Sequence, residues 1–311
     1  MSENVPALLD RPFGGTDNNG PVDVLKGTDT NVYKMYLAAD RNLVYKIYEA
    51  GVGTGGIAGG KINGALLGLT CGAIEQDAMT KITNDLKKEI GGDFIINIVG
   101  FSRGGPEALD FANKVETQIQ QGGKYFTGAR IGFLGLFDPV DAIDGLRNDA
   151  GNLNITVPRG ISHVAEAIAL SENRLQFNKI NLMGSPNTTV IGFLGAHSDI
   201  GGGYGNDPLS NTTLHWMMSQ ATAAGLAFTN MYPGLVNGYA PAQVHDSYAI
   251  NLGGPPLAPI QRNLPGTLLV DTPGGYIRYN AIPFASSYWD PCFANDLSIY
   301  SSLTQTFRII A

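Results

Sequence analysis

The sequence predicts an α/β fold with a mainly parallel sheet and helices on both faces. Short apolar runs rich in β-branched residues alternate with segments of helical periodicity between about residues 43 and 225. This alternation is typical of strand–helix–strand units. The chain has 311 residues, of which 43% are hydrophobic and only 15% are charged, so it can bury a large core. We therefore expect one folded domain over residues 1–311.

The predicted elements are bounded by glycine, proline or polar residues. Residues 1–30, rich in Gly, Asn, Asp and Pro, are expected to be mostly loop. The predicted strands cover residues 43–48, 94–99, 131–137 and 190–196, and the predicted helices cover residues 76–90, 103–121, 161–172 and 210–225.

The C-terminal part lacks a clean periodicity, because Pro and Gly recur throughout it. We interpret the residues after 226 as a loop-rich C-terminal cap, with residues 226–290 as a cap or lid. The aromatic and apolar side chains there either face a lipid or simply cover the core, and the sequence leaves both interpretations open.

Charge and cysteine content exclude several classes of function. The 20 basic and 27 acidic residues give a net charge of −7, and no basic run interleaves with aromatics, so we expect no nucleic-acid partner. Cys71 and Cys292 are far apart, which favours two buried free thiols over a disulfide. The sequence offers no ligand set for a structural zinc, and we expect no metal and no cofactor.

The N-terminus resembles no signal peptide, since it has neither a basic segment nor an apolar run. The sequence also contains no uninterrupted apolar stretch of about 18 residues, so we expect no membrane span. These observations predict a cytoplasmic location in the producing cell, with secretion by a signal-less route left open.

The segment Gly100-Phe101-Ser102-Arg103-Gly104 matches the pattern G-x-S-x-G between a predicted buried strand and a predicted helix. A serine on such a tight turn takes strained backbone angles, which explains the glycines beside it. The N-terminus of the following helix can stabilise an oxyanion. This context favours a nucleophilic Ser102 over a plain strand-to-helix turn.

A nucleophilic serine needs a histidine base and an acid that orients the base. Asp138 and His197 each follow a predicted apolar strand, and they come after Ser102 in the order typical of this kind of fold. For the acid, Asp199 is the main alternative; the remaining candidates are Asp110, Asp141 and Asp144.

The chain has four histidines, and His245 is the alternative base. His163 and His215 fall within predicted helices, where a structural role is expected.

Several motifs together resemble a family of α/β-hydrolase domains that includes the phospholipase-type lipase effectors of bacterial type VI secretion systems. The motifs are Gly100-Phe-Ser-Arg-Gly-Gly105, Phe133-Leu-Gly-Leu-Phe-Asp138, Gly195-Ala-His-Ser-Asp-Ile-Gly-Gly-Gly-Tyr204, Tyr48-Glu-Ala-Gly-Val-Gly-Thr-Gly55, Asn31-Val-Tyr-Lys-Met-Tyr36, Leu214-His-Trp-Met-Met218 and Val244-His-Asp-Ser-Tyr248. The resemblance extends over about residues 14–248.

The resemblance implies an α/β-hydrolase fold and a catalytic triad of Ser102, Asp138 and His197. It also implies an oxyanion hole formed by Arg103 with Gly15 and Thr16. The family's Asp-Gly-Thr appears in this chain as Gly14-Gly15-Thr16, so the aspartate is missing. The acidic pair that the family carries before an arginine, in the helix after the catalytic acid, appears as Ser171-Glu172-Asn173-Arg174, another partial departure.

The sequence therefore predicts a serine esterase or lipase that hydrolyses acyl esters, and the resemblance implies phospholipids, contact with a membrane surface, and a secretion or immunity partner. The alternative is a catalytically inert binding or delivery module on the same scaffold. A third interpretation makes His197, Asp199 and His245 the metal ligands of a phosphodiesterase, although their spacing matches no familiar site.

Overall fold

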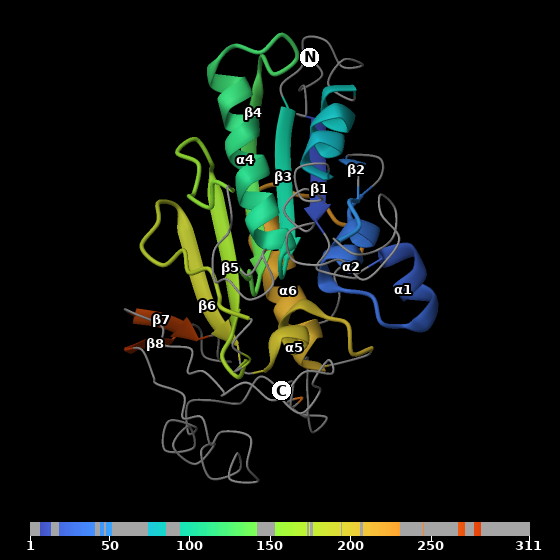
Figure 1. Cartoon of the computed structure of the whole chain (residues 1–311), viewed down its shortest axis with the longest axis vertical. Helices are drawn as coiled ribbons and strands as arrows, with labels where there is room; N and C mark the ends of the chain where they lie inside the picture. Colours follow the sequence, from blue (N-terminus) through green and yellow to red (C-terminus); the bar gives the residue numbers. More distant parts are fainter. Residues whose placement is uncertain are drawn as a thin grey trace.

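A computed structural model gives the fold (Figure 1). It describes residues 7–13, 19–40, 44–46, 48–51, 74–84, 94–141, 153–172, 174, 177–193, 195–205, 208–230, 245, 267–270 and 277–280.

The described residues form one eight-stranded sheet with the order β2-β1-β3-β4-β5-β6-β7-β8. The strands are β1 (Ala7–Phe13), β2 (Val44–Lys46), β3 (Phe94–Phe101), β4 (Ala129–Phe137), β5 (His163–Ala169), β6 (Thr188–Phe193), β7 (Thr267–Val270) and β8 (Ile277–Asn280). Neighbouring strands are parallel except for β7 and β8, which are antiparallel. The parallel strands therefore end at a common edge, where α/β folds place their ligand sites.

Helices cover both faces of the sheet, as the sequence predicts (Figure 1). They are α1 (Gly20–Lys26), α2 (Asn31–Ala38), α4 (Gly104–Gln120), α5 (His197–Gly201) and α6 (Pro208–Ala223), and residues 74–84 are also helical. Helix α4 and residues 74–84 pack on one face, whereas α2 and α6 pack on the other.

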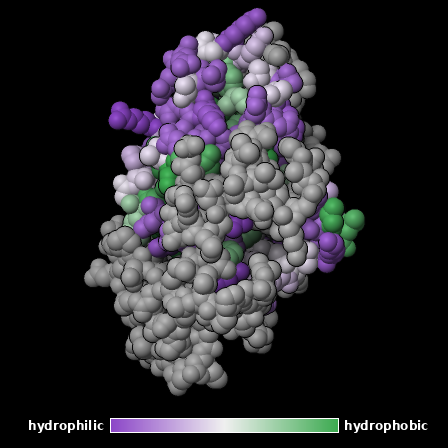
Figure 2. All heavy atoms as spheres, in the orientation of Figure 1, coloured by the Kyte–Doolittle hydropathy of each residue, from purple (hydrophilic) through white to green (hydrophobic). Residues whose placement is uncertain are grey.

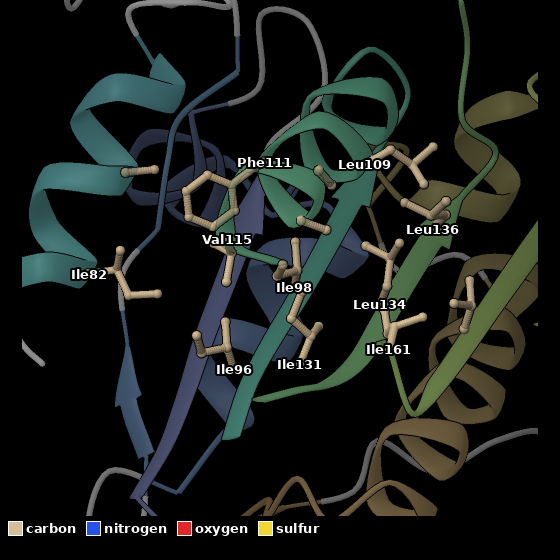
Figure 3. Close-up of a cluster of buried hydrophobic side chains, with 14 of the residues drawn as sticks. Ile82, Ile96, Ile98, Leu109, Phe111, Val115, Ile131, Leu134, Leu136 and Ile161 are labelled. Carbon is tan, nitrogen blue, oxygen red and sulfur yellow. The ribbon is translucent and has the colours of Figure 1, made fainter. Parts of the chain in front are cut away.

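Strand β3 shows how the sheet separates two cores. Ile96 and Ile98 join the cluster beneath α4 (Figure 3), and Ile95 and Val99 join the opposite cluster. All four side chains are buried, which explains why the strand is an uninterrupted apolar run.

An irregularity at Gly132 changes which residues of β4 face each core. The register pairs Ile96 with Ile131 but Asn97 with Phe133, so Gly132 is an extra residue. A side chain on Gly132 would lie 2.4 Å from Ile95 Cγ2, so only glycine fits there.

Two predictions about secondary structure are wrong. Residues 161–172 were expected to be helical, but they contain strand β5, which is buried at the centre of the sheet. Residues 1–30 contain β1 and α1 instead of mostly loop. Strands β1 and β5 are each paired on both sides with other strands, and this pairing overrides the local preference of the sequence.

The remaining predicted strands coincide with β2, β3, β4 and β6, and the remaining predicted helices coincide with residues 74–84, α4 and α6. Of the predicted cap, the structure describes short segments that include β7 and β8. Cys71 and Cys292 lie outside the described residues. None of the described helices has both the length and the apolar character that a membrane crossing requires.

Candidate active site

Ser102 occupies the sharp turn between β3 and α4. Its φ of 57° lies in the left-handed region, which a side-chain-bearing residue adopts only under strain. The turn is held by its backbone: the Ser102 N–H donates to the Phe137 carbonyl, and the Ser102 carbonyl accepts from the N–H groups of Gly105 and Val140. These bonds fix a buried serine at the sheet edge.

Two glycines make this turn sterically feasible. A Cβ on Gly100 would lie 2.4 Å from the Gly104 carbonyl oxygen, and one on Gly105 would lie 2.4 Å from Pro139 Cβ. The close approach of β3, α4 and the residue after Asp138 therefore depends on the absence of side chains at both positions.

Asp138 follows β4 directly and lies beside the serine turn, because Phe101 and Phe137 are in register. Its φ is 38°, and its side chain is fully buried. One carboxylate oxygen accepts a hydrogen bond from the Ala169 N–H at 2.9 Å, and the other lies 2.7 Å from His197 Nδ1. An ionised carboxylate only accepts hydrogen bonds, so Nδ1 is the donor and Nε2 carries the lone pair of the neutral ring.

His197 is the first residue of α5, and its ring is enclosed by two aromatic rings. Phe101 stacks on it with a centroid distance of 4.6 Å, and Phe177 meets it edge-on at 4.7 Å. Burial lowers the pKa of His197, and the carboxylate of Asp138 opposes this effect without reversing it. The imidazole is therefore neutral at neutral pH, which is the form of a general base.

Glu172 and Arg174 support His197 from the segment after β5, a role that the sequence did not reveal. The His197 N–H donates to Glu172 Oε2, and Arg174 forms two side-chain hydrogen bonds with the Glu172 carboxylate. The guanidinium lies 3.5 Å from the centroid of Phe177. The sequence offered one signal for this segment, the departure from the family pattern at Ser171-Glu172-Asn173-Arg174. That departure did not indicate that Glu172 contacts His197.

Asp199 and His245, the alternative acid and base, contact each other. Asp199 Oδ1 is 2.5 Å from His245 Nδ1, and Asp199 Oδ2 accepts hydrogen bonds from the N–H groups of His245 and Ala196. The structure thus assembles two carboxylate–imidazole pairs.

The remaining candidates for the base and the acid lie elsewhere in the fold. His163 is in β5, where its Nε2 contacts Gln220, and His215 is in α6. Asp110 pairs with Lys114, and Asp141 accepts a hydrogen bond from Asn178. Asp144 lies outside the described residues.

Of the predicted oxyanion-hole residues, Arg103 directly follows Ser102 and precedes the first turn of α4. Gly15 and Thr16 lie outside the described residues. For the metal interpretation, the described part of the chain contains no cluster of three or more histidine, cysteine or acidic residues suited to a metal ion.

A family model matches this chain over residues 107–220. It is described as the catalytic domain of the type VI secretion (T6SS) phospholipase effector Tle1-like family. The matched segment contains Asp138 and His197 and begins just after Ser102. No curated protein gives a significant match to the chain.

The solved structures that resemble the chain include the following two. An uncharacterized protein from Pseudomonas aeruginosa has a TM-score of 0.51 and 18% identity, over 72% of this chain and 46% of that one. The Tle1 effector bound to the VgrG spike of the type 6 secretion system has a TM-score of 0.48 and 22% identity, over 67% of this chain and 53% of that one.

This chain therefore spans about half the length of either structure, and at these identities the likeness concerns the fold alone. The resemblance predicted from the motifs is nevertheless confirmed: on an α/β-hydrolase fold, residues 107–220 match the catalytic domain of Tle1-like phospholipase effectors of type VI secretion systems.

Proposed function

We propose that this chain is a serine esterase that hydrolyses acyl esters, with phospholipids as its substrate class. The family match supports a hydrolase of the phospholipase type. The proposal adds a serine mechanism, the triad of Ser102, Asp138 and His197, and the phospholipid substrate class. The observation that carries it is the buried 2.7 Å contact between Asp138 and His197, formed beside the strained turn of Ser102.

In the proposed mechanism, His197 Nε2 takes the proton of the Ser102 hydroxyl as its oxygen attacks the ester carbonyl carbon. Asp138 stabilises the resulting imidazolium through Nδ1. Backbone N–H groups of Arg103 and of the Gly15–Thr16 segment donate to the oxyanion. His197 returns the proton to the departing alcohol, leaving an acyl group on Ser102. Water, deprotonated by His197, then releases the fatty acid and restores the serine.

The contact between His197 and Phe101 favours this histidine over His245 as the base. Phe101 is the residue before Ser102, and its ring stacks on the His197 imidazole. The Cβ of any residue replacing Gly201 would also clash with the Phe101 ring, so α5 packs directly against the end of β3.

The test uses purified protein with phosphatidylcholine and p-nitrophenyl butyrate. Ser102→Ala should abolish hydrolysis of both esters, and Asp138→Asn should lower kcat by about 10⁴-fold because it favours the wrong imidazole tautomer. Ser219→Ala is the matched control, since this α6 serine only donates to the His215 carbonyl. Wild-type rates in the Ser102 variant would refute the proposal.

Labelling by a fluorophosphonate separates this proposal from an inert scaffold. An activated Ser102 should react covalently with the probe, and Ser102→Ala should not. A wild-type protein that stays unlabelled would favour the binding or delivery module instead.

A metal-dependent phosphodiesterase would behave differently. The proposed steps use only protein groups and water, so prolonged treatment with EDTA should leave ester hydrolysis unchanged. Loss of activity that added zinc or another divalent ion restores would contradict the proposed mechanism.

Contact with a membrane surface is a further part of the proposal, supported by the exposed apolar residues of α1. Leu25 is 86% exposed, and Val22 and Val24 are also exposed; Figure 2 shows hydrophobic atoms protruding at the edge where α1 lies. Helix α1 lies near the site, because Thr30 bridges to Gly202 just after α5.

We propose that the exposed apolar residues of α1 contact a phosphatidylcholine bilayer, because a lipid ester substrate lies in such a bilayer. Leu25→Asp should reduce co-sedimentation with phosphatidylcholine vesicles, whereas the rate on soluble p-nitrophenyl butyrate should stay at the wild-type value because Leu25 makes little contact with the fold. Lys26→Gln serves as the control. Equal co-sedimentation of the wild type, Leu25→Asp and Lys26→Gln would contradict this part of the proposal.

We also propose that the chain acts as a type VI secretion effector released by a signal-less route, with an immunity partner in the producer. The description of the matched family supports this role. Expression in the periplasm of a susceptible bacterium should lyse the cells, cytoplasmic expression should not, and Ser102→Ala should be harmless in both compartments. Toxicity of the Ser102 variant would contradict the role.

A further inference from the structure

The side-chain amide of Asn31 joins three helices, one of which carries His197. Asn31 is the first residue of α2 and begins the motif Asn31-Val-Tyr-Lys-Met-Tyr36, which the proposed mechanism does not use. Its side chain is fully buried, and Nδ2 donates hydrogen bonds of 2.8 Å to two carbonyl oxygens, those of Ile200 in α5 and Ser210 in α6. One amide therefore fixes the end of α5 against the starts of α2 and α6.

The two acceptors determine the orientation of the amide. A carbonyl oxygen only accepts hydrogen bonds, so the amide nitrogen, which carries two N–H donors, must face Ile200 and Ser210. The amide oxygen of Asn31 is buried and has no hydrogen-bond partner among the described residues. The side chain therefore acts through its donors, and the place suits an amide but not a carboxylate of the same shape.

The backbones of α2 and α5 also meet at this place. Thr30 and Gly202 form an antiparallel bridge. A Cβ on Gly202 would lie 2.8 Å from the Asn31 backbone nitrogen, and the φ of Gly202 is 82°. Both observations require glycine, so the chain that leaves α5 passes directly against the start of α2.

Helix α5 depends on outside contacts for its position. It has five residues, and a helix of little more than one turn is not stable by itself. Its first residue is His197, whose backbone N–H donates to Glu172, and its last residue, Gly201, packs on the Phe101 ring. The same ring stacks on the His197 imidazole. A displacement at the end of α5 should therefore move the His197 ring as well.

We propose that Asn31 is a positioning residue of the proposed active site, because it anchors the end of α5 and so holds His197 against Asp138. The proposal rests on the proposed function, in which His197 is the base. Asn31 acts through α5, since both of its hydrogen bonds go to backbone carbonyls. An asparagine that only stabilised the fold would change the amount of folded protein and leave the folded active site as it is.

The first test measures kcat and KM on p-nitrophenyl butyrate. Asn31→Ala removes both donors, and a small displacement of the base should lower kcat by roughly 10- to 100-fold while KM keeps its wild-type value. Asn113→Ala is the matched control, because this α4 amide likewise donates to backbone carbonyls of a distant segment, those of Asn154 and Thr156. It should keep the wild-type kcat. A wild-type kcat in Asn31→Ala, or an equal loss in Asn113→Ala, would overturn the proposal.

Gly202→Ala tests the same anchor from the other side. Its methyl group would meet the backbone of Thr30 and Asn31 and displace the end of α5 without removing the Asn31 amide. A loss of kcat at unchanged KM is again expected. This variant decides the question if Asn31→Ala lacks the native near-UV circular dichroism. A wild-type kcat in folded Gly202→Ala would overturn the proposal.

A titration of His197 tests the inference without turnover. In protein with isotope-labelled histidine, the ring signal of His197 in the NMR spectrum is assigned by its absence in His197→Gln. Burial lowers the pKa of His197 from its ordinary value of 6.5. A ring released from Phe101 should therefore titrate closer to 6.5 in Asn31→Ala than in the wild type.

The carboxylates and the guanidinium that act on this ring are those of Asp138, Glu172 and Arg174. All three are present in wild type, Asn31→Ala and Asn113→Ala, so a change in the pKa reports the position of the ring. Asn113→Ala should titrate like the wild type, and a wild-type pKa in Asn31→Ala would overturn the inference. If the wild-type protein hydrolyses neither phosphatidylcholine nor p-nitrophenyl butyrate, the proposed function fails, while this titration still decides whether Asn31 positions His197.

Discussion

The backbone N–H of His197 donates a hydrogen bond to Glu172 Oε2, 3.2 Å away, across the gap between the ends of β5 and β6. The same carboxylate is paired with Arg174 at 2.9 Å. The Glu172 side chain is fully buried and that of Arg174 is largely buried. Glu172 therefore holds the base of the proposed triad from its backbone side, while Asp138 holds it from the ring side.

Glu172→Gln tests this positioning role. The variant leaves the Arg174 guanidinium largely buried without its carboxylate, which should cost about 3 kcal/mol of unfolding free energy. A small displacement of His197 should also lower kcat by roughly 10- to 100-fold. Urea unfolding and ester hydrolysis check both values. Asp77→Asn, which removes a half-exposed partner of Lys81, should cost at most about 1 kcal/mol.

The pH dependence of ester hydrolysis should report the environment of His197. Burial lowers the pKa of this imidazole below the ordinary value of 6.5. Only the neutral ring can accept the serine proton, so the acid limb of the kcat/KM profile on a soluble ester should have its midpoint below pH 6.5. A profile for kcat/KM with its acid midpoint above 6.5 would show that a different base, or a more exposed imidazole, limits the reaction.

The sequence predicts the central strands and the candidate triad for one physical reason. The strands that end before Ser102, Asp138 and His197 are apolar because both faces of a parallel sheet are buried. Polar residues directly after such strands meet at one edge, and the structure brings Asp138 and His197 together there. Strand ends and order along the chain therefore predicted that Asp138 and His197 lie close together.

The sequence does not predict β5, because its composition resembles a helix. Ala165, Ala167 and Ala169 are good helix formers, and Glu166 is a charged residue in a strand without solvent exposure. Glu166 is stabilised by the backbone N–H of Leu182, which lies 16 residues further along the chain. Such a partner leaves no local signal, and the same holds for Glu172, whose partner His197 is 25 residues away.

Gly100→Ala should disrupt the serine turn. Its new Cβ would lie 2.4 Å from the Gly104 carbonyl oxygen, which is backbone and cannot rotate away. We expect a loss of about 1–3 kcal/mol in unfolding free energy and a lower rate of fluorophosphonate labelling at Ser102. Gly160→Ala is the control, since the methyl there meets only the end of the Glu116 side chain. Labelling at the wild-type rate in Gly100→Ala would show that the turn tolerates a side chain.

Glu75 should make the stability of the fold depend on pH. Burial, reinforced by the neighbouring Asp110, raises the pKa of Glu75 to about 8 from its ordinary value of 4.5, although Lys114 contacts both carboxylates and opposes the shift. The folded state therefore holds an additional proton between about pH 4.5 and 8, so the free energy of unfolding should fall as the pH rises through this range.

Glu75→Gln removes this titration, and its stability should vary less steeply over the same range in urea unfolding. Asp77→Asn, in the same helical segment but half-exposed, should keep the wild-type slope. Parallel curves for wild type and Glu75→Gln would mean that the proton is lost equally readily from the folded and unfolded chains.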